Sequence, residues 1–308
     1  MQFYRHLSQL EKMGPQLRAV TVGAYDGIHL GHQEILRQLI GRAQEMGGHA
    51  LVMSFEPLPR EFFSPDQPAA RLTRFRERYK LLADFGIEEF FCPKFSSIRD
   101  LSPQHFIQDI LVKGLNASHI VVGEDFRFAA QRIGTLDCLM SAGVTSGFGV
   151  TAVPGVCYKN QRASSTLIRE SLSIGDMKTV CGMLGRHYSI SGKVVRGLGL
   201  GKKLGFPTAN VNLNRRRTPV DGIFAARISG LADKELDGVA SVGTRPTVGG
   251  VEPLLEVFIF NFDEEIYGKY ITVHFVERLR EERKYLDVET MKEQMHKDVA
   301  EAQLILSV

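Results

Sequence analysis

The feature that most constrains the fold is a change of pattern partway along the chain. From Leu17 to about Gly155, apolar runs of strand length alternate with segments of helical periodicity. Parallel strands need such crossover connections, so this part predicts an α/β domain with a parallel, Rossmann-like sheet. The expected strands are 18–22, 49–55, 89–95, 119–122 and 149–153, and the expected helices are 34–46, 74–85 and 103–112.

From Tyr188 onward, short strands are separated by glycine-rich turns, which is typical of an antiparallel sheet closing into a β-barrel. Two short helices precede it, and Asp287 caps a predicted terminal helix. A chain of 308 residues is long enough for two domains. We place the boundary near Gly185, giving domains 1–184 and 185–308. The expected strands are 189–195, 223–229, 238–242, 254–261 and 271–275, and the expected helices are 165–173, 176–184 and 287–306.

Composition and charge exclude several protein classes. With 44% hydrophobic and 24% charged residues, the chain is globular rather than disordered. A net charge of +3 is too small to indicate nucleic-acid binding by itself. The four cysteines are isolated from one another, which favours a reducing cytoplasm over disulfides or structural zinc. We expect no secretory signal in residues 1–12, and glycines interrupt the uncharged stretch 140–158, so we expect no membrane span and no membrane partner.

A glycine-rich turn with two histidines follows the first predicted strand and opens the first long helix. Gly23 and Gly31 permit close backbone approach, and a helix N-terminus favours an anion by roughly 0.3–1 kcal/mol. His29 and His32 would share one face of that turn and donate hydrogen bonds to a phosphate. The order of strand, turn and helix predicts a phosphate site. A structural role for the pair is the alternative, whereas zinc is disfavoured because no Glu or Cys accompanies the histidines.

Two further segments carry groups suited to a nucleotide. Ser165 and Thr166 start a predicted helix, with Arg169 on the same side, and together they offer donors for a polyphosphate. An ordinary helix cap with a surface arginine is the alternative. The loop after the strand 119–122 carries a set of residues that could frame a nucleoside. These residues are Asp125, Arg132 and Gly134.

The second half has its own glycine-rich loop, at 197–205, in which main-chain N–H groups and an ammonium could surround phosphates. Thr208 and Asn210 alternate in the extended segment that follows, so both point the same way and offer oxygens to Mg²⁺. A flexible hairpin is the alternative. The candidate phosphate-binding residues of the loop are Gly199, Gly201, Lys203 and Gly205.

Glu256 is the most informative carboxylate of the second half. Period-two alternation places it on one face of its strand with Leu254, Phe258 and Phe260, while Leu255, Val257 and Ile259 occupy the other. A carboxylate in such apolar surroundings tends toward a raised pKa and can act as a general base. A buried ion pair with Arg227 or Arg245 is the alternative.

Three runs of the first half resemble the adenylyltransferase module of the bacterial bifunctional riboflavin kinase/FAD synthetase family. They are Gly-x-Tyr-Asp-Gly-x-His-x-Gly-His at 23–32, Val-Gly-x-Asp-Phe-x-Phe at 122–128 with Arg132 and Gly134, and Ser-Ser-Thr-x-Ile-Arg at 164–169. The resemblance implies that His29 and His32 contact the ATP α-phosphate, while Ser165, Thr166 and Arg169 hold the leaving phosphates. Gly23, Asp26, Gly31 and Asp125 are then candidate nucleotide-binding residues.

The second half resembles the riboflavin kinase module of the same family. The matching runs are Leu-Gly-Phe-Pro-Thr-Ala-Asn at 204–210, Ser-Val-Gly-Thr-Arg-Pro-Thr at 241–247, Leu-Leu-Glu-Val at 254–257, Tyr267-Gly268 and Leu279-Arg280-x-Glu282. The resemblance implies that Thr208 and Asn210 bind magnesium-ATP and that Glu256 activates the ribityl hydroxyl of riboflavin. Departures from the family pattern affect flavin positioning: Ala129 replaces a glycine, Leu58 and Phe258 replace histidines, and His187 replaces a proline.

The expected activity is therefore a pair of consecutive, magnesium-dependent reactions with ATP as co-substrate. The barrel would convert riboflavin and ATP to FMN and ADP, and the first half would convert FMN and ATP to FAD and pyrophosphate. Two alternatives stay open. One is an adenylyltransferase for a different phosphorylated cofactor, with the barrel as a binding appendage. The other is an RNA-binding protein using the arginines 215–217, although we expect no nucleic-acid partner.

Overall fold

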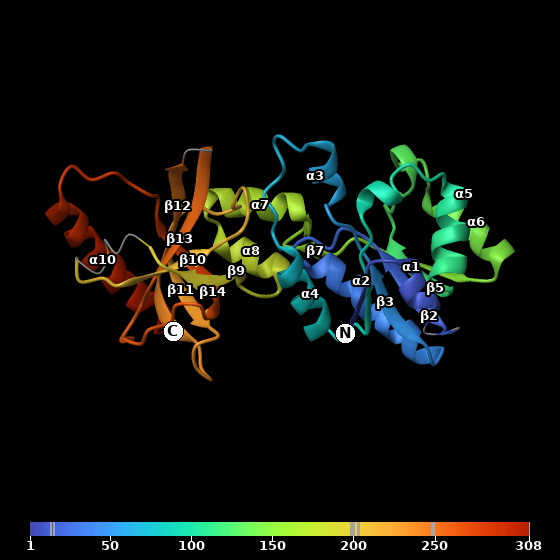
Figure 1. The fold of residues 1–308 in the computed structure, drawn as a ribbon, viewed down its shortest axis with the longest axis horizontal. Helices are drawn as coiled ribbons and strands as arrows, with labels where there is room; N and C mark the ends of the chain where they lie inside the picture. Colours follow the sequence, from blue (N-terminus) through green and yellow to red (C-terminus); the bar gives the residue numbers. More distant parts are fainter. Residues whose placement is uncertain (13, 15, 198–200, 202–203, 248–249, 308) are drawn as a thin grey trace. The chain divides into compact units, whose positions relative to one another are not determined.

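The chain forms two compact units in the computed structural model, which describes residues 1–12, 14, 16–197, 201, 204–247 and 250–307 (Figure 1). Unit 1 comprises Met1–Ala69 and Phe75–Ala163. Unit 2 comprises Ala70–Arg74 and Ser164–Val308. The short helices that precede the barrel thus group with it. The predicted boundary near Gly185 marks the change of sequence pattern and stays a prediction.

Unit 1 is built on a six-stranded sheet in the order β1-β4-β3-β2-β5-β6, with every pairing parallel. The predicted parallel sheet is therefore confirmed. The chain moves outward from β2 in one direction through β3 and β4, and in the other through β5 and β6. Open sheets bind ligands at such a reversal, outside the carboxyl ends of the strands. The strands are β1 (Gln2–Tyr4), β2 (Arg18–Val22), β3 (His49–Met53), β4 (Glu89–Phe91), β5 (Ala117–Gly123) and β6 (Gly149–Val153).

Helices cover both faces of this sheet, and each face has its own apolar cluster. The residues of β2 alternate between the two clusters, with Val20 and Val22 in one and Ala19 in the other. The predicted helix 103–112 is present as α5 continued by the π-helix η2. The helices are α1 (Leu7–Glu11), α2 (Leu30–Glu45), α3 (Pro59–Phe63), α4 (Phe75–Asp84), α5 (Pro103–His105), η2 (Phe106–Gly114) and α6 (Leu136–Ser146), with 3₁₀ turns η1 (Phe95–Ser97) and η3 (Ala130–Arg132).

Unit 2 is a closed barrel in the order β10-β13-β12-β11-β14-β9, with every pairing antiparallel. The predicted barrel and its terminal helix are thus confirmed. The Asp287 side chain caps α10 by accepting the Thr290 N–H at 2.7 Å. The elements are α7 (Ser165–Ile174), α8 (Met177–Leu184), β9 (Tyr188–Val195), β10 (Thr208–Asn212), β11 (Gly222–Ser229), β12 (Leu236–Thr247), β13 (Gly250–Ile259), β14 (Tyr270–Arg280) and α10 (Val288–Leu306).

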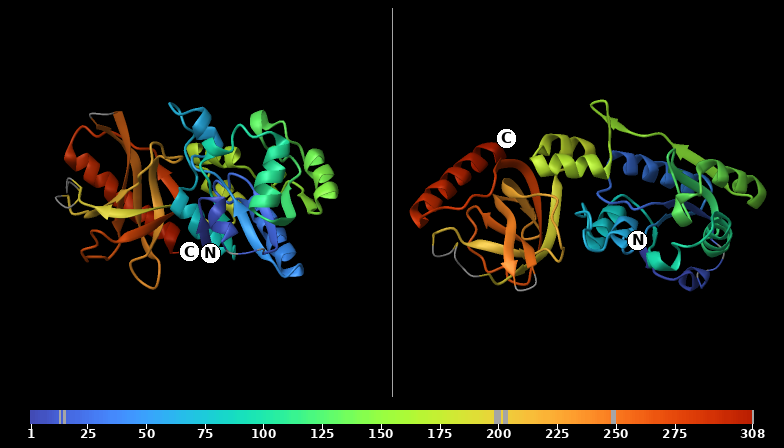
Figure 2. Two further views of the ribbon diagram at one scale, coloured as in Figure 1. Left: turned by 45° about the vertical axis from the view of Figure 1, so that its right-hand side comes forward. Right: turned by 90° about the horizontal axis from the view of Figure 1, so that it is seen from above.

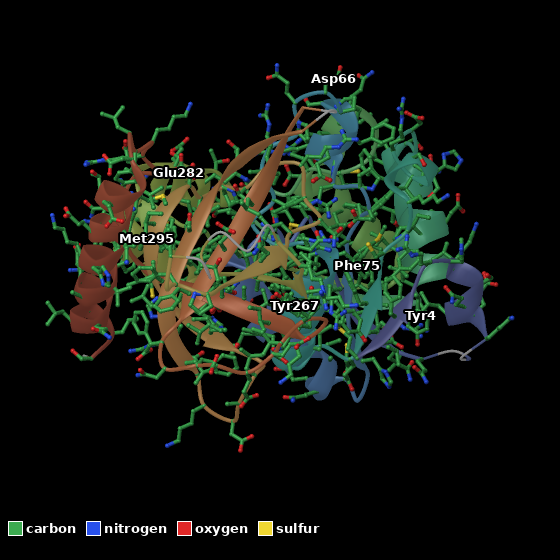
Figure 3. All side chains as sticks on the ribbon, turned by 60° about the vertical axis from the view of Figure 1, so that its left-hand side comes forward. Tyr4, Asp66, Phe75, Tyr267, Glu282 and Met295 are labelled. Atoms are coloured by element: carbon green, nitrogen blue, oxygen red, sulfur yellow. The ribbon has the colours of Figure 1, made fainter. Side chains whose placement is uncertain are left out.

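Helix α10 packs on the outside of the barrel, against β11, β12 and β14 (Figure 2). Ala302 and Leu306 are buried there, and Figure 3 shows the α10 side chains, Met295 among them, beside the barrel strands. A short hairpin, β7 (Cys157–Tyr158) and β8 (Gln161–Arg162), ends unit 1. Within the described ranges, no helix has the length and apolarity needed to cross a membrane.

Candidate active sites

The histidine turn of unit 1, residues 23–32, lies between the end of β2 and the start of α2, where the strand order of the sheet reverses. His29 is the N-cap residue of α2, and its Nδ1 accepts the main-chain N–H of His32 at 3.4 Å. The two imidazole rings are stacked, with centroids 3.8 Å apart and planes at 22°. The structure thus brings the two predicted histidines together at the edge of the sheet where a ligand is expected.

The two glycines of the turn make room for rings of the chain itself. A Cβ added at Gly23 would lie 3.0 Å from Cε2 of Tyr25, and one at Gly31 would lie 3.2 Å from Cε1 of His29. The main-chain oxygen of Ala163 lies 3.8 Å from the same Gly31 position. Both glycines are therefore needed for local packing. Their predicted contact with a nucleotide stays a prediction.

His32 is partly buried in this turn, and its Nδ1 is enclosed completely. Burial, and then the nearby His29, holds the pKa of His32 well below its ordinary value, so its imidazole is neutral at pH 7. His29 and Asp26 are also buried, at 8% and 3% exposure. The neutral imidazole of His32 keeps one N–H, which can donate to a phosphate oxygen without placing a positive charge in the turn.

Two residues outside the turn, which the sequence analysis did not identify, donate hydrogen bonds to its backbone. The carbonyl of Ala24 accepts from Nη1 of Arg78 at 2.9 Å and from Oγ of Ser54 at 3.2 Å. Arg78 lies on α4 and is fully buried. It occupies a position of the helix that faces the core together with Leu82, one turn later. An arginine in the apolar stripe of a helix is a sequence signal that could have identified this support.

The loop after β5 is ordered mainly by its own backbone. Phe128 and Gly134 exchange two main-chain hydrogen bonds, at 3.1 and 2.9 Å, and a Cβ at Gly134 would strike the Phe128 ring at 2.8 Å. Asp125 is exposed and forms an ion pair with Arg162 at 3.1 Å. Gly134 therefore has a local packing role. Nucleotide contacts of Asp125 and Arg132 stay predictions.

The family departure at Ala129 has a visible structural consequence. Its φ of 65° and ψ of −174° lie in a region that is almost restricted to glycine. Leu58, another departure, is the N-cap residue of α3 and is buried. His187 has a buried Nδ1 that meets no hydrogen-bond partner among the described residues. The departures thus lie in packed or strained positions, and their effect on flavin binding stays a prediction.

The start of α7 is capped by Ser164, whose side chain accepts the Leu167 N–H at 3.2 Å. Ser165 and Thr166 follow in the first turn. Arg169 binds main-chain carbonyls: its Nε donates to Ala70 at 2.6 Å and its Nη1 to Ser165 at 2.9 Å. This run belongs to unit 2 and the histidine turn to unit 1. The predicted role of these side chains at leaving phosphates therefore stays a prediction.

The barrel carries the second predicted site on its outer wall. In the register of the barrel, Asn210 of β10 lies directly opposite Glu256 of β13, and Thr208 lies opposite Phe258. Val211 and Val257, which alternate with these residues, are buried at 3% and 0% exposure, so they face the barrel interior. Thr208 and Asn210 therefore point the same way, as the alternation predicted, and the strand register adds that Glu256 shares this outer face with them.

Two described residues of the glycine loop, Gly197 and Gly201, lie against these oxygen donors. A Cβ at Gly197 would lie 2.6 Å from Oδ1 of Asn210, and one at Gly201 would lie 3.0 Å from Oγ1 of Thr208. Gly205 adopts a left-handed φ of 86°, which favours glycine. The predicted phosphate-binding residues Gly199 and Lys203 lie outside the described residues.

A divalent cation fits this donor set, because Mg²⁺ prefers hydroxyl, amide and carboxylate oxygens with phosphate completing its shell. The amide of Asn210, the hydroxyl of Thr208 and the carboxylate of Glu256 all lie on one face of adjacent strands. Phe258 is packed by Phe206, with ring centroids 5.3 Å apart, so an aromatic wall borders the donors. The arrangement brings oxygen ligands and one carboxylate beside an apolar surface.

For Glu256, the alternative was an ion pair with Arg227 or Arg245, and the structure describes the side chain of Arg227 alone. Arg227 lies 3.8 Å from the carboxylate of Asp237 and donates to the Leu306 carbonyl at 3.4 Å. These contacts give Arg227 partners of its own. The side chain of Arg245 lies outside the described set.

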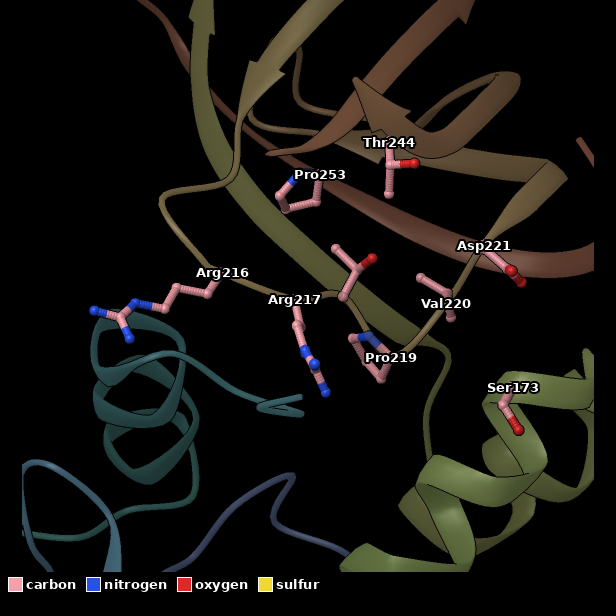
Figure 4. A pocket seen from close by; sticks show the side chains of 9 residues that line it. Ser173, Arg216, Arg217, Pro219, Val220, Asp221, Thr244 and Pro253 are labelled. Atoms are coloured by element: carbon pink, nitrogen blue, oxygen red, sulfur yellow. The ribbon is translucent and has the colours of Figure 1, made fainter. Parts of the chain in front are cut away.

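The three consecutive arginines 215–217 have different surroundings. Arg215 is half-buried, and its Nη1 donates to the Arg71 carbonyl and the Tyr188 hydroxyl, both at 3.3 Å. Arg216 and Arg217 are exposed and border a cavity of about 500 Å³ (Figure 4). Because Arg215 supports the loop structurally, the run is not a uniform basic surface of the kind that the RNA-binding alternative needs.

The comparisons with known proteins agree on both halves. A family model for FAD synthetase matches residues 12–167, and one for riboflavin kinase matches residues 184–306. The bifunctional riboflavin kinase/FMN adenylyltransferase of Escherichia coli K12 is 38% identical over 97% of this chain and 96% of its own length. The protein of that name from Pseudomonas fluorescens is 39% identical over 99% and 98%.

Among solved structures, a chain from Streptococcus pneumoniae described as a macrolide-efflux protein superposes with a TM-score of 0.83 at 29% identity. The superposition covers 98% of each chain, so both units of the fold recur there together. That description names a different activity from the names of the sequence relatives. Identity of 37–39% over nearly the whole length, together with the two family models, decides the family. The chain belongs to the bifunctional riboflavin kinase/FMN adenylyltransferase family.

Proposed function

We propose that the outer wall of the barrel phosphorylates riboflavin and that the histidine turn of unit 1 adenylylates the resulting FMN. The observation that carries this division is the cross-strand pair of Asn210 and Glu256, with Thr208 on the same face. It places one carboxylate beside oxygen ligands in unit 2, whereas the histidine turn offers the neutral imidazole of His32. The two sites therefore suit two different nucleophiles.

In the kinase reaction, Glu256 accepts the proton of the terminal ribityl hydroxyl while that oxygen attacks the γ-phosphorus of ATP, and ADP leaves. Thr208 and Asn210 would hold Mg²⁺, which when bound neutralises charge on the phosphates. The backbone of the glycine loop, including Gly201 and Gly205, surrounds the phosphates. The aromatic wall at Phe258 and Phe206 offers an apolar surface for the flavin ring.

In the adenylylation reaction, a phosphate oxygen of FMN attacks the α-phosphorus of ATP and pyrophosphate leaves. The nucleophile is already an anion, so this site needs no general base. His29 and His32 donate hydrogen bonds to the α-phosphate as its charge redistributes. We further propose that Ser165, Thr166 and Arg169 bind the leaving diphosphate. Gly23, Asp26, Gly31 and Asp125 would line the nucleotide site.

The finer assignments belong to this proposal as well. We place the domain boundary near Gly185, the cellular location in the cytoplasm, and Mg²⁺ as the metal of both reactions. Riboflavin, FMN, FAD and ATP are the small-molecule ligands. The isolated cysteines, none of them in a disulfide among the described residues, suit a reducing compartment.

Chromatography of one reaction mixture tests the proposal. Protein, riboflavin, Mg²⁺ and ATP are incubated, and samples are separated over time. We expect FMN and ADP to appear first, followed by FAD and pyrophosphate. Omission of Mg²⁺ should stop both steps. Accumulation of FMN without FAD, or no turnover of riboflavin, would contradict the assignment.

A further inference from the structure

Three aromatic rings of the histidine turn are in contact: His29 and His32 are stacked, and Tyr25 lies tilted against His32. His29 lies against one side of His32, with ring centroids 3.8 Å apart. Tyr25 contacts His32 as well, with centroids 4.9 Å apart and planes at 42°. His32 is thus packed by two rings, and Tyr25 is the one with no role in the reaction described above.

Tyr25 is itself held firmly. Its hydroxyl lies 2.6 Å from Oγ1 of Thr21, on β2, and the exposures of the two residues are 1% and 0%. The ring also lies on Gly23, where any Cβ would be 3.0 Å from Cε2. The φ of Tyr25 is 50°, a left-handed conformation that is unfavourable for a non-glycine residue. Such a conformation persists because the surrounding contacts determine it.

The ring of His32 is not oriented by a hydrogen bond at its Nδ1 among the described residues. Histidines at functional sites are commonly oriented by a hydrogen bond at the second ring nitrogen. The Nδ1 of His32 is buried and meets no hydrogen-bond partner in the described part of the chain. His29 differs, because its Nδ1 accepts the His32 N–H at 3.4 Å. The orientation of the His32 ring therefore depends on packing against its neighbours.

We propose that Tyr25, anchored by Thr21, is a positioning residue for adenylyl transfer: its ring holds the His32 imidazole against His29, with the imidazole proton on Nε2. This inference rests on the proposed function of the histidine turn. The proton belongs on Nε2 because a buried Nδ1–H would have no acceptor among the described residues. Tyr25 thereby fixes the direction of the hydrogen bond that His32 donates to phosphate, while the buried Nδ1 without an acceptor fixes the tautomer.

The protonation behaviour of His32 agrees with this geometry. Burial is the largest cause that lowers its pKa, and His29 is the second. The Tyr25 ring covers one side of the imidazole, so removing it would admit water and return the pKa toward its ordinary value. His29 and Tyr25 are the titratable side chains whose rings contact His32 in the described structure.

The test compares Tyr25→Leu, which removes the ring, with Tyr25→Phe, which keeps it. Tyr4→Leu is the matched control, because Tyr4 is a buried tyrosine in the apolar core of the same unit. Steady-state kinetics of FAD formation from FMN are measured for each full-length variant. Riboflavin phosphorylation in the same preparations reports on the integrity of unit 2. Imidazole NMR titration follows His32, assigned among the nine histidines with His32→Ala.

We expect Tyr25→Leu to lower kcat for FAD formation about 10- to 100-fold with little change in KM for ATP, because a misplaced donor loses mainly transition-state binding. The pKa of His32 should rise. Tyr25→Phe should stay within about 5-fold of the wild type, since the positioning ring remains. Tyr4→Leu should lower thermal stability but leave kcat and the His32 titration near wild-type values.

Equal effects of Tyr25→Leu and Tyr4→Leu on kcat would overturn the inference, as would an unchanged His32 titration in Tyr25→Leu. If His32→Ala itself retained full FAD formation, the proposed function of the turn would fail instead. The two failures are therefore distinguishable.

Discussion

The histidine turn of unit 1 and the outer wall of the barrel, the two proposed phosphate sites, are built in different ways. The turn gathers its groups from ten consecutive residues, and its rings pack on one another, with His29 and His32 stacked at 3.8 Å. The barrel wall gathers its groups from strands about fifty residues apart, and Asn210 meets Glu256 only through strand register. One site is local and aromatic, and the other is non-local and rich in oxygen donors.

This difference follows from the nucleophile that each reaction uses. A hydroxyl must lose a proton as it attacks phosphorus, so the kinase site needs a carboxylate near its donors. A phosphate monoester already carries negative charge, so the adenylylation site needs donors and orientation. The proposed chemistry of the two substrates thus accounts for a carboxylate, Glu256, on the barrel wall and for a neutral His32 in the histidine turn.

The largest expected effect comes from removing the proposed base. Glu256→Gln keeps the size of the side chain and removes its ability to take a proton. We expect riboflavin phosphorylation to fall about 10²- to 10⁴-fold, the usual range for a general base. FAD formation from supplied FMN should be unchanged, as measured by chromatography of both reactions. Comparable loss of both activities would remove the distinction between the two sites.

His32→Ala tests the proposed role of the histidine turn in FAD formation. Loss of one preorganised donor commonly costs about 10²- to 10³-fold in turnover, so FAD formation should fall by that order. FMN formation should stay at the wild-type rate in the same preparation. A variant that still makes FAD at the normal rate would show that the histidine turn does not contact the reacting phosphate.

Asn210→Leu should change metal dependence in the barrel alone. The substitution removes the amide oxygen opposite Glu256 while keeping a similar volume. Loss of one ligand worth about 1.4 kcal/mol would raise the Mg²⁺ concentration for half-maximal kinase activity about tenfold. The Mg²⁺ dependence of FAD formation is the internal control. A parallel shift in both reactions would indicate a general effect of the substitution on the protein.

Low pH should destabilise unit 1. The pKa values of His32 and His119 are both lowered, mainly by burial, so these groups take up protons more readily when the chain unfolds. Stability is unaffected above the unfolded pKa near 6.5 and falls as pH drops below it, by up to about 1.4 kcal/mol per pH unit for each histidine.

Urea unfolding followed by circular dichroism at pH 7.5, 6.5 and 5.5 measures this effect. His119→Gln is the comparison variant, because it should reduce the dependence while leaving His32 in place. An unfolding midpoint that does not move between pH 7.5 and 5.5 would contradict the assignment of these two histidines as buried and neutral.

The smallest expected effect is a gain of stability at Ala129. Its backbone, at φ 65° and ψ −174°, suits glycine, so Ala129→Gly should stabilise unit 1 by about 1 kcal/mol. The gain is less than the full strain because glycine also has more conformational freedom in the unfolded chain. Thermal unfolding of the two proteins under one set of conditions gives the difference. A lower melting temperature for the glycine variant would mean that this conformation carries no strain.

Much of the fold could be predicted because the two halves have different hydrophobic periods. Strands β2 and β6 have the predicted bounds, and the closed barrel and α10 were expected from the glycine-rich strand pattern. Other elements were missed. Strand β1 has three residues, too few for a period, and α6, with eleven residues, was not expected. Gly143 sits inside α6 because a Cβ there would lie 2.6 Å from the Phe148 carbonyl oxygen.

The candidate sites were predictable where spacing alone brings residues together. His29 and His32 are one helical turn apart, and Thr208 and Asn210 alternate along one strand. The partner of Arg78 was not predictable, although an arginine in an apolar helix stripe marks the residue itself, because Arg78 reaches the Ala24 carbonyl from α4, more than fifty residues away. Likewise, the sequence does not reveal that Gly23 and Gly31 accommodate the rings of Tyr25 and His29, because this requires the turn in three dimensions.

Mixing two variants, each defective in one of the two reactions, tests the central claim of two separate sites most directly. Glu256→Gln and His32→Ala proteins are each incubated with riboflavin, Mg²⁺ and ATP, alone and then together in one tube. The His32→Ala protein should make only FMN, the Glu256→Gln protein should make neither product, and the mixture should make FAD. Absence of FAD from the mixture, or FAD formation by either variant alone at the wild-type rate, would contradict the account.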